Sequence, residues 1–219
     1  VVKTIPLLDA GSYDVLAIYR EVNGTKTTIH KGTDGFNVYK LASAITIYKL
    51  NDTIYVGENE TIELAIDLDN AHNTGDISIF INGVEHKTTT SKLKVDIAGL
   101  NATDYEVKVV YHGNDWYNES TATGSFKVIK NPTPFEIKVT NSNVGGVEQI
   151  NVTLPGDATG QVLLDIDGQH YYANVTKGLA QFNIVGLKEG EHKFNVTYIG
   201  NYKYVANSTK SSLTVSKVQ

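Results

Sequence analysis

Residues 97–128 read IAGLNATDYEVKVVYHGNDWYNESTATGSFKV, and residues 184–215 read IVGLKEGEHKFNVTYIGNYKYVANSTKSSLTV. The two stretches align without a gap and share Gly-Leu, then Tyr-x-Gly-Asn, then a later Tyr. Self-similarity at a fixed long period indicates a tandem repeat. We therefore interpret the recurring Gly-Asn and Tyr as turn chemistry of the fold. Trp116 is different, because Lys203 stands in its place in the second stretch.

Apolar and polar residues alternate through the repeat, as they do in a half-buried strand. One expected strand places four residues on a single face: Tyr105, Val107, Val109 and Tyr111. The Asn-Gly pair at 82–83 and the Asp-Gly pair at 167–168 predict two-residue hairpin turns. Short period-two strands between frequent turns predict an all-β fold of antiparallel sandwiches.

The repeat divides the chain into three expected domains. Residues 42–130 and 131–219 are complete copies, each about the size of a seven-stranded immunoglobulin-like (Ig-like) sandwich. Residues 1–41 match only the end of a copy, which we interpret as the C-terminal half of an Ig-like domain, its last three strands. The fold class is therefore all-β, with tandem Ig-like antiparallel β-sandwiches.

The incomplete first copy predicts an open sheet face. Burying a large apolar side chain stabilises a fold by roughly 1.5–3 kcal/mol, so we expect other strands to cover this face. They come from sequence upstream of Val1 in the same parent protein, which we favour, or from another subunit by strand complementation. The predicted strand-partner face consists of Val15, Ala17, Tyr19, Phe36 and Val38.

Ig-type domains often carry a Tyr at the start of the sixth strand, with its hydroxyl bonded back to the preceding corner. Tyr105 stands at this place in the second copy, and His192 stands there in the third. A side chain that only fills the core is the alternative interpretation.

Composition excludes several classes of function. The chain has 219 residues, a formal net charge of −5 and no basic run, so nucleic acid is not an expected partner. It has no Cys, which excludes disulfides, Cys-based zinc sites and a thiol nucleophile. The six His show no zinc-site spacing, and no apolar stretch is long enough for a membrane span. We expect no enzyme activity and no cofactor.

Asn-x-Ser/Thr sequons are candidate glycosylation sites where they are accessible. Alternation places Asn151 and Asn195 on solvent faces of their strands, and we expect these two to be modified readily. The candidates are Asn23, Asn51, Asn59, Asn101, Asn118, Asn151, Asn174, Asn195 and Asn207.

Two further groups of residues have ligand-binding alternatives. Trp116, with Tyr117 and Asn114 beside it, has the chemistry to stack on a sugar ring, but packing within the protein is the interpretation we favour. Asp side chains in turns offer oxygen ligands for calcium, although no run has an EF-hand spacing, and solvated turn Asp is the interpretation we favour. Those Asp residues are Asp67, Asp69, Asp76, Asp157, Asp165 and Asp167.

The stretches VGENETIELAI (56–66) and VTLPGDATGQVLLDIDG (152–168), with the ending GL…Y.V.V.Y.G…Y…S, carry a resemblance. The chain resembles the tandem bacterial-type Ig-like repeats of adhesin-like cell-surface proteins, most closely those of methanogenic archaea. The third copy departs from the pattern, because VGEN becomes VGGV. The resemblance implies a repetitive extracellular protein without catalytic apparatus.

The expected function is thus a non-enzymatic stalk or adhesin segment on a prokaryotic cell surface. Its partners are neighbouring Ig-like repeats of the same parent protein or another subunit, and a surface glycan or protein receptor. The alternatives are a surface-filament subunit assembled by strand complementation, and a carbohydrate-binding module that uses Trp116.

Overall fold

The structure is a computed structural model that describes residues 2–5, 8–69 and 72–217. These residues form strands, turns and loops, and none of them belongs to a helix. The described part of the chain accordingly has no helix that is long and apolar enough to cross a membrane. Contacts divide the chain into two compact units, of which Val1–Asp52, Glu60–Ile97 and Tyr105–Phe126 form one, and Thr53–Asn59, Ala98–Asp104 and Lys127–Gln219 the other. The all-β fold predicted from alternation is confirmed.

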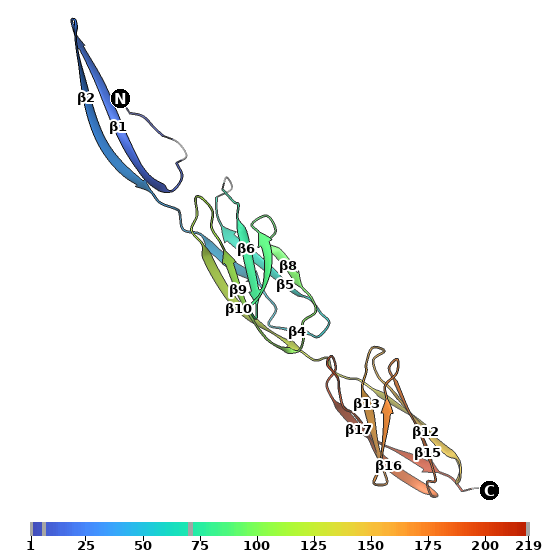
Figure 1. Ribbon diagram of the computed structural model, residues 1–219. Helices are drawn as coiled ribbons and strands as arrows, with labels where there is room; N and C mark the ends of the chain where they lie inside the picture. The colour runs from blue at the N-terminus through green and yellow to red at the C-terminus, as the bar shows by residue number, and fades with distance from the viewer. Residues whose placement is uncertain (1, 6–7, 70–71, 218–219) are drawn as a thin grey trace. The chain divides into compact units, whose positions relative to one another are not determined.

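The N-terminal part of the first unit is a long antiparallel hairpin (Figure 1). Strand β1 (Gly11–Asn23) pairs with β2 (Lys26–Val38) along its whole length. The expectation of three strands in residues 1–41 is wrong, because residues 2–5 form no strand. They align with β8 (Lys94–Ile97), which pairs with β5 (Glu60–Asp67), and among the described residues before the hairpin none forms a strand equivalent to β5.

The strands that follow the hairpin, β3 to β10, form two sheets. The remaining bounds are β3 (Ala44–Lys49), β4 (Thr53–Tyr55), β6 (Asp76–Ile81), β7 (Val84–Thr89), β9 (Thr103–Tyr111) and β10 (Ser120–Ile129). One sheet has the order β3-β5-β8 and the other has the order β4-β10-β9-β6-β7. A Cβ added to Gly124 in β10 would lie 2.9 Å from Leu50 Cδ2 and 3.2 Å from Ile47 Cδ1. The two sheets therefore pack face to face, and we call this part the second sandwich.

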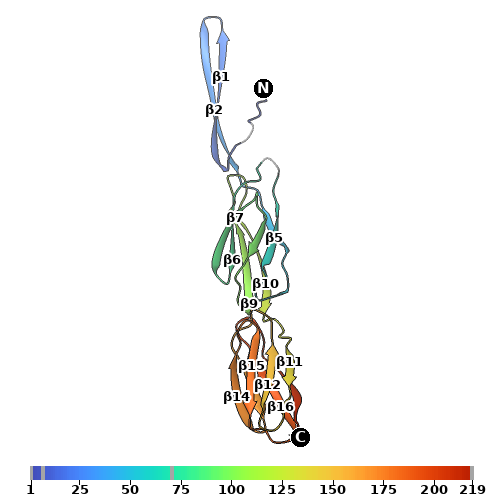
Figure 2. The same cartoon turned by 90° about the vertical axis from the view of Figure 1, so that its right-hand side faces the viewer.

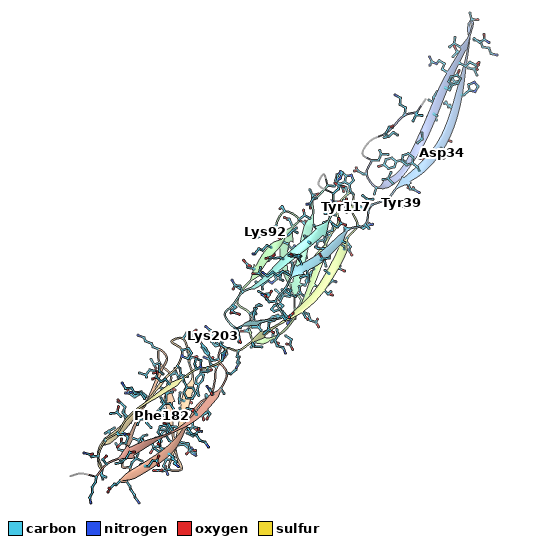
Figure 3. The ribbon with its side chains drawn as sticks, turned by 180° about the vertical axis from the view of Figure 1, so that it is seen from behind. Asp34, Tyr39, Lys92, Tyr117, Phe182 and Lys203 are labelled. Atoms are coloured by element: carbon cyan, nitrogen blue, oxygen red, sulfur yellow. The ribbon has the colours of Figure 1, made fainter. Side chains whose placement is uncertain are left out.

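Strands β11 to β17 form the third sandwich (Figure 2). Their bounds are β11 (Glu136–Thr140), β12 (Val147–Thr153), β13 (Gln161–Ile166), β14 (Gln169–Asn174), β15 (Leu179–Val185), β16 (Gly190–Tyr198) and β17 (Asn207–Val215). The sheets have the orders β11-β12-β15 and β14-β13-β16-β17. A single apolar cluster joins Ile150 and Phe182 of the first sheet to Leu164 and Val196 of the second (Figure 3 labels Phe182).

The alternation prediction is confirmed for three of the four residues expected on one face of β9, since Tyr105 is half-buried, and both turn predictions are confirmed. Val107, Val109 and Tyr111 are buried on one face of β9, and the Asn82-Gly83 turn joins β6 to β7. Asn82 has a φ of 46° and Gly83 one of 83°, as a turn with two left-handed residues requires. The Asp-Gly pair at 167–168 joins β13 to β14 with φ angles of 48° and 75°.

A buried Tyr lies at the same place in each sandwich. Tyr111 and Tyr198 have no solvent-exposed surface, and their hydroxyls donate to the carbonyls of Thr74 and Thr159 at 2.9 and 2.7 Å. Burial raises the pKa of both phenols. The recurring Tyr of the repeat is therefore a core residue whose polar end is satisfied.

Candidate functional site

The stretch around Trp116 is a turn that the side chain of Asn114 holds in place. Asn114 Oδ1 accepts hydrogen bonds from the backbone amides of Trp116 at 2.9 Å and Tyr117 at 2.8 Å. Asn114 Nδ2 donates to the carbonyls of His72 and Thr74 at 2.9 and 3.0 Å. Asn114 therefore ties this turn to the segment before β6, and both polar atoms of its side chain are engaged in hydrogen bonds within the protein.

The two aromatic residues of the turn also contact the protein itself. The buried Tyr117, labelled in Figure 3, donates its hydroxyl to Asp69 Oδ2 at 2.9 Å. The half-buried Trp116 lies against the His72 ring, with the ring centroids 4.3 Å apart. One face of the indole is thus covered by imidazole, which agrees with packing as the role of Trp116.

The third sandwich builds the same turn with a different side chain at the position of Trp116. Asn201 Oδ1 accepts from the amides of Lys203 and Tyr204 at 2.8 and 2.7 Å. Tyr204 Oη and Lys203 Nζ both bind the Asp157 carboxylate at 2.6 Å. The hydrogen bond from Lys203, followed by that from Tyr204, lowers the pKa of the Asp157 carboxyl. Asn, Asp and Tyr are therefore shared turn chemistry, whereas Trp116 and Lys203 are specific to their copies.

The chain leads into each sandwich beside this turn. In the first unit, Leu41 N donates to Trp116 O at 2.7 Å, and Asn118 N donates to Leu41 O at 2.9 Å. In the other unit, Asn131 exchanges equivalent hydrogen bonds with Lys203 O and Val205 N, at 2.8 and 3.0 Å.

A Lys side chain adds the same contact to each lead-in segment. Lys40 Nζ donates to Asn114 O, and Lys130 Nζ donates to Asn201 O. The contacts of the turn and the lead-in segment are thus repeated, each within its own unit.

The corner predicted at His192 is found, and the hairpin has an equivalent corner at Tyr13. His192 Nε2 lies 2.8 Å from Lys188 O, four residues back, so His192 takes the place of the corner Tyr. In the hairpin, Tyr13 Oη donates to Asp9 O at 2.7 Å, again four residues back. Tyr105 stacks on Phe126 with centroids 5.0 Å apart.

The strand-partner face is open in the structure. Val15, Tyr19 and Phe36 are 39%, 63% and 40% exposed, Ala17 is also exposed, and Val38 is half-buried. The opposite face of the hairpin carries apolar side chains as well, together with Arg20 and Lys31. It exposes Leu16, Ile18, Val22 and Ile29.

The sequons differ in what their side chains bind. Asn59 and Asn174 are exposed, and within the described residues their Nδ2 atoms donate no hydrogen bond. Asn51 Nδ2 donates to Glu60 Oε2 at 3.3 Å, and Asn207 Nδ2 donates to Thr133 O at 2.7 Å. At Asn51 and Asn207, a glycan would be attached to an amide nitrogen that already donates a hydrogen bond of the fold.

The remaining sequons fall between these cases. Asn151 and Asn195, which alternation placed on solvent faces, are both half-buried. Asn151 Oδ1 is buried, and Asn195 Nδ2 donates to Thr197 Oγ1 at 3.2 Å. Asn23 lies at the exposed end of β1 beside its turn, and Asn101 lies in an exposed loop. Asn118 is exposed, and its Nδ2 lies 3.4 Å from Lys40 O.

The candidate calcium ligands are scattered over the two sandwiches. Asp165 lies 3.8 Å from His170, and Asp167 lies 2.6 Å from His192. Asp67 ends β5, and Asp76 begins β6. Among the residues that the structure describes, no three His, Asp or Glu side chains are grouped to hold a metal ion.

Two buried carboxylates were not singled out from the sequence. Glu60 and Glu148 are 0% and 2% exposed, and each follows Val-Gly-x-x in its copy. Glu60 accepts from Asn51 N at 3.0 Å, whereas Glu148 Oε2 has no hydrogen-bond partner in the described structure. Their equal spacing in the two copies is the signal that would have identified them.

No protein-family model matches the chain, and no curated protein does. Among solved structures, it is similar to the titin domains z1z2 in complex with telethonin (17% identity, 83% of this chain and 100% of that chain, TM-score 0.46). It is also similar to fibronectin(III)-like modules of Clostridium thermocellum CbhA (14% identity, 80% of this chain and 95% of that chain, TM-score 0.35). A Parabacteroides merdae β-glucuronidase matches over 25% of its own length (12% identity, 77% of this chain, TM-score 0.30). The TM-scores of these three matches lie below 0.5, so the assignment of the fold rests on the strands and sheets described above.

Proposed function

We propose that the chain is a non-enzymatic structural segment of an extracellular stalk, of the adhesin type, on a prokaryotic cell surface. The supporting observation is that the polar and aromatic residues of the candidate site bind the fold itself. Asn114 and Asn201 hold their turns, and Tyr117 and Tyr204 bind Asp carboxylates. The residues that suggested a ligand site thus serve to build each copy and its lead-in segment. A stalk needs such repeated, self-contained construction.

The proposal is tested on intact cells of the source organism. An antibody raised against residues 42–219 should label the cell surface without permeabilisation, and external protease should remove the labelling. Labelling that appears only after the cells are permeabilised would contradict the surface location. An unrelated cytosolic antigen, followed in parallel, controls for cell integrity.

The carbohydrate-binding alternative depends on Trp116. Its indole already contacts His72, so we expect a glycan array to give the same signal for the natural chain and for Trp116→Ala. A glycan that binds the natural chain and loses binding on substitution of Trp116 would favour the binding module.

The filament alternative is favoured by one observation, the exposed apolar hairpin. It differs from the stalk in where the strands that cover the hairpin come from.

A further inference from the structure

The hairpin has the local geometry of the last two strands of a sandwich. Tyr13 stacks on Phe36 with ring centroids 5.5 Å apart and an interplanar angle of 18°. Tyr105 and Phe126 stack at 5.0 Å and 12° in the second sandwich. The two pairs hold the same position in the aligned repeat. Strands β1 and β2 are therefore equivalent to β9 and β10.

In the second sandwich, the equivalent strand has partners that the hairpin lacks. Strand β6 pairs antiparallel with β9 along the edge of β9 that faces away from β10, with Ile81 opposite Val107 and Ile77 opposite Tyr111. The facing sheet β3-β5-β8 covers the inner side. Val107 and Tyr111 are consequently 2% and 0% exposed. Within the described residues β1 pairs with β2 alone, and its inner side chains remain exposed.

We propose that the hairpin completes an Ig-like sandwich together with strands equivalent to β3–β8, which are carried on the same polypeptide ahead of it. The connection into β1 supports this source. In the second and third sandwiches, Leu100 and Leu187 belong to the connection that joins the preceding strands to β9 and β16. Leu8 holds the same place ahead of β1, and Tyr13 closes the corner onto Asp9. Strands from a separate molecule would not need this connection.

The hairpin also specifies one property of the strands that cover it. Asp34, labelled in Figure 3, pairs with Val15 and so lies on the inner face. It holds the place of Gly124, where any Cβ would come within 2.9 Å of Leu50. Gly35 N donates to Asp34 Oδ1 at 2.8 Å, and a buried carboxylate is costly unless its remaining charge is also paired. The covering strands therefore present a cation or hydrogen-bond donor toward Asp34 where the second sandwich presents Leu50.

The inference rests on the repeat architecture and is independent of the cell-surface location. Its test compares residues 1–219 with two chimeras in which strands of this chain precede the hairpin. The first places residues 42–99 before Leu8, and it is made with Asp34 and with Asp34→Gly. The second places residues 131–186 before Leu8 and keeps Asp34, because the third sandwich already has a side chain, Ser211, at this position. Amide hydrogen exchange is measured from Val15 to Tyr19.

We expect rapid exchange in residues 1–219 at every protein concentration. Exchange should slow by at least ~100-fold in the first chimera with Asp34→Gly, because a covered strand opens rarely, and by less when Asp34 is retained. The second chimera should show slowed exchange without any substitution. Strands β9 and β16 serve as internal references for an intact fold.

Three results would overturn the inference. Slow exchange in a dilute monomer of residues 1–219 would show that the hairpin closes by itself. Protection that rises with concentration would identify a second copy as the partner, as in a filament. Rapid exchange in both chimeras, with β9 and β16 protected, would show that the hairpin is no part of a sandwich. None of these results bears on the surface labelling, so the two proposals fail separately.

Discussion

His192 makes one corner of the third sandwich titratable. Its Nε2 lies 2.8 Å from Lys188 O, and its Nδ1 lies 2.6 Å from Asp167 Oδ2. Both partners accept hydrogen bonds, so the doubly protonated ring suits the site. The carbonyl of Lys188 is the largest cause that raises the pKa of His192, and the carboxylates of Asp167 and Glu148 add to it. Tyr13 builds the same corner with a hydroxyl, which donates to Asp9 O.

The first prediction follows from the sign of this shift. Because the pKa of His192 is higher in the folded state than in the unfolded state, the contribution of His192 to stability is complete below the unfolded pKa of about 6.5. It is lost as pH rises through the folded pKa. The amides of β13 and β16 should therefore exchange faster at pH 9 than at pH 6 once intrinsic rates are corrected. His192→Tyr should remove this change, and an unchanged pH profile would contradict the assignment.

The second prediction concerns glycosylation. In native protein, glycopeptide mapping should find higher occupancy at Asn59 and Asn174 than at Asn51 and Asn207, because the latter two use Nδ2 in hydrogen bonds of the fold. Equal occupancy at all four would mean that modification precedes folding. Removal of each sequon by Thr→Ala at its third position provides the control for peptide assignment.

The turns that connect the strands depend on glycines, and the free space around these glycines differs between turns. Gly200, in the turn after β16, has a φ of 82°, and an added Cβ would lie 2.9 Å from Ala206 N and 3.0 Å from Tyr204 O. Gly168, in the turn between β13 and β14, has a φ of 75°, and an added Cβ would meet no atom within 4 Å. The two residues share a left-handed backbone and differ in space, which makes them a matched pair.

The third prediction uses this pair. Gly168→Ala should cost about 1–2 kcal/mol of unfolding free energy, the penalty of a left-handed residue with a Cβ. Gly200→Ala should cost more, since the backbone of the turn must also move. Denaturant unfolding of the full chain measures both. A smaller loss for Gly200→Ala than for Gly168→Ala would contradict the close packing of this turn.

Local sequence patterns predicted the strands and turns well. They did not predict which residues far apart in the sequence bind each other. Alternation placed Val107 and Val109 correctly, because the faces of a strand follow from its own sequence. The bond from Asn207 to Thr133 O spans 74 residues of sequence, and no local pattern encodes such a partner. Residues 2–5 were wrongly expected to form a third strand for the same reason, because a segment forms a strand only where another strand pairs with it.

For the whole molecule, the apolar cluster of the third sandwich consists of its own residues. The fourth prediction is that Leu164→Ala, at a fully buried site, costs about 2–5 kcal/mol. Exchange should accelerate in β13 and β16, with β6 and β9 unchanged. Ile79→Ala in the second sandwich should give the reverse. Acceleration of all four strands by either substitution would show that the chain unfolds as one cooperative body.

The turn held by Asn114 and Asn201 has an evolutionary consequence. Each Asn side chain accepts from the backbone amides two and three residues further on, so the turn keeps its shape with different side chains directly before Tyr. That side chain is an indole in one copy and an ammonium in the next. A gene that duplicates this repeat can therefore change its surface chemistry one copy at a time, with no new loop to evolve.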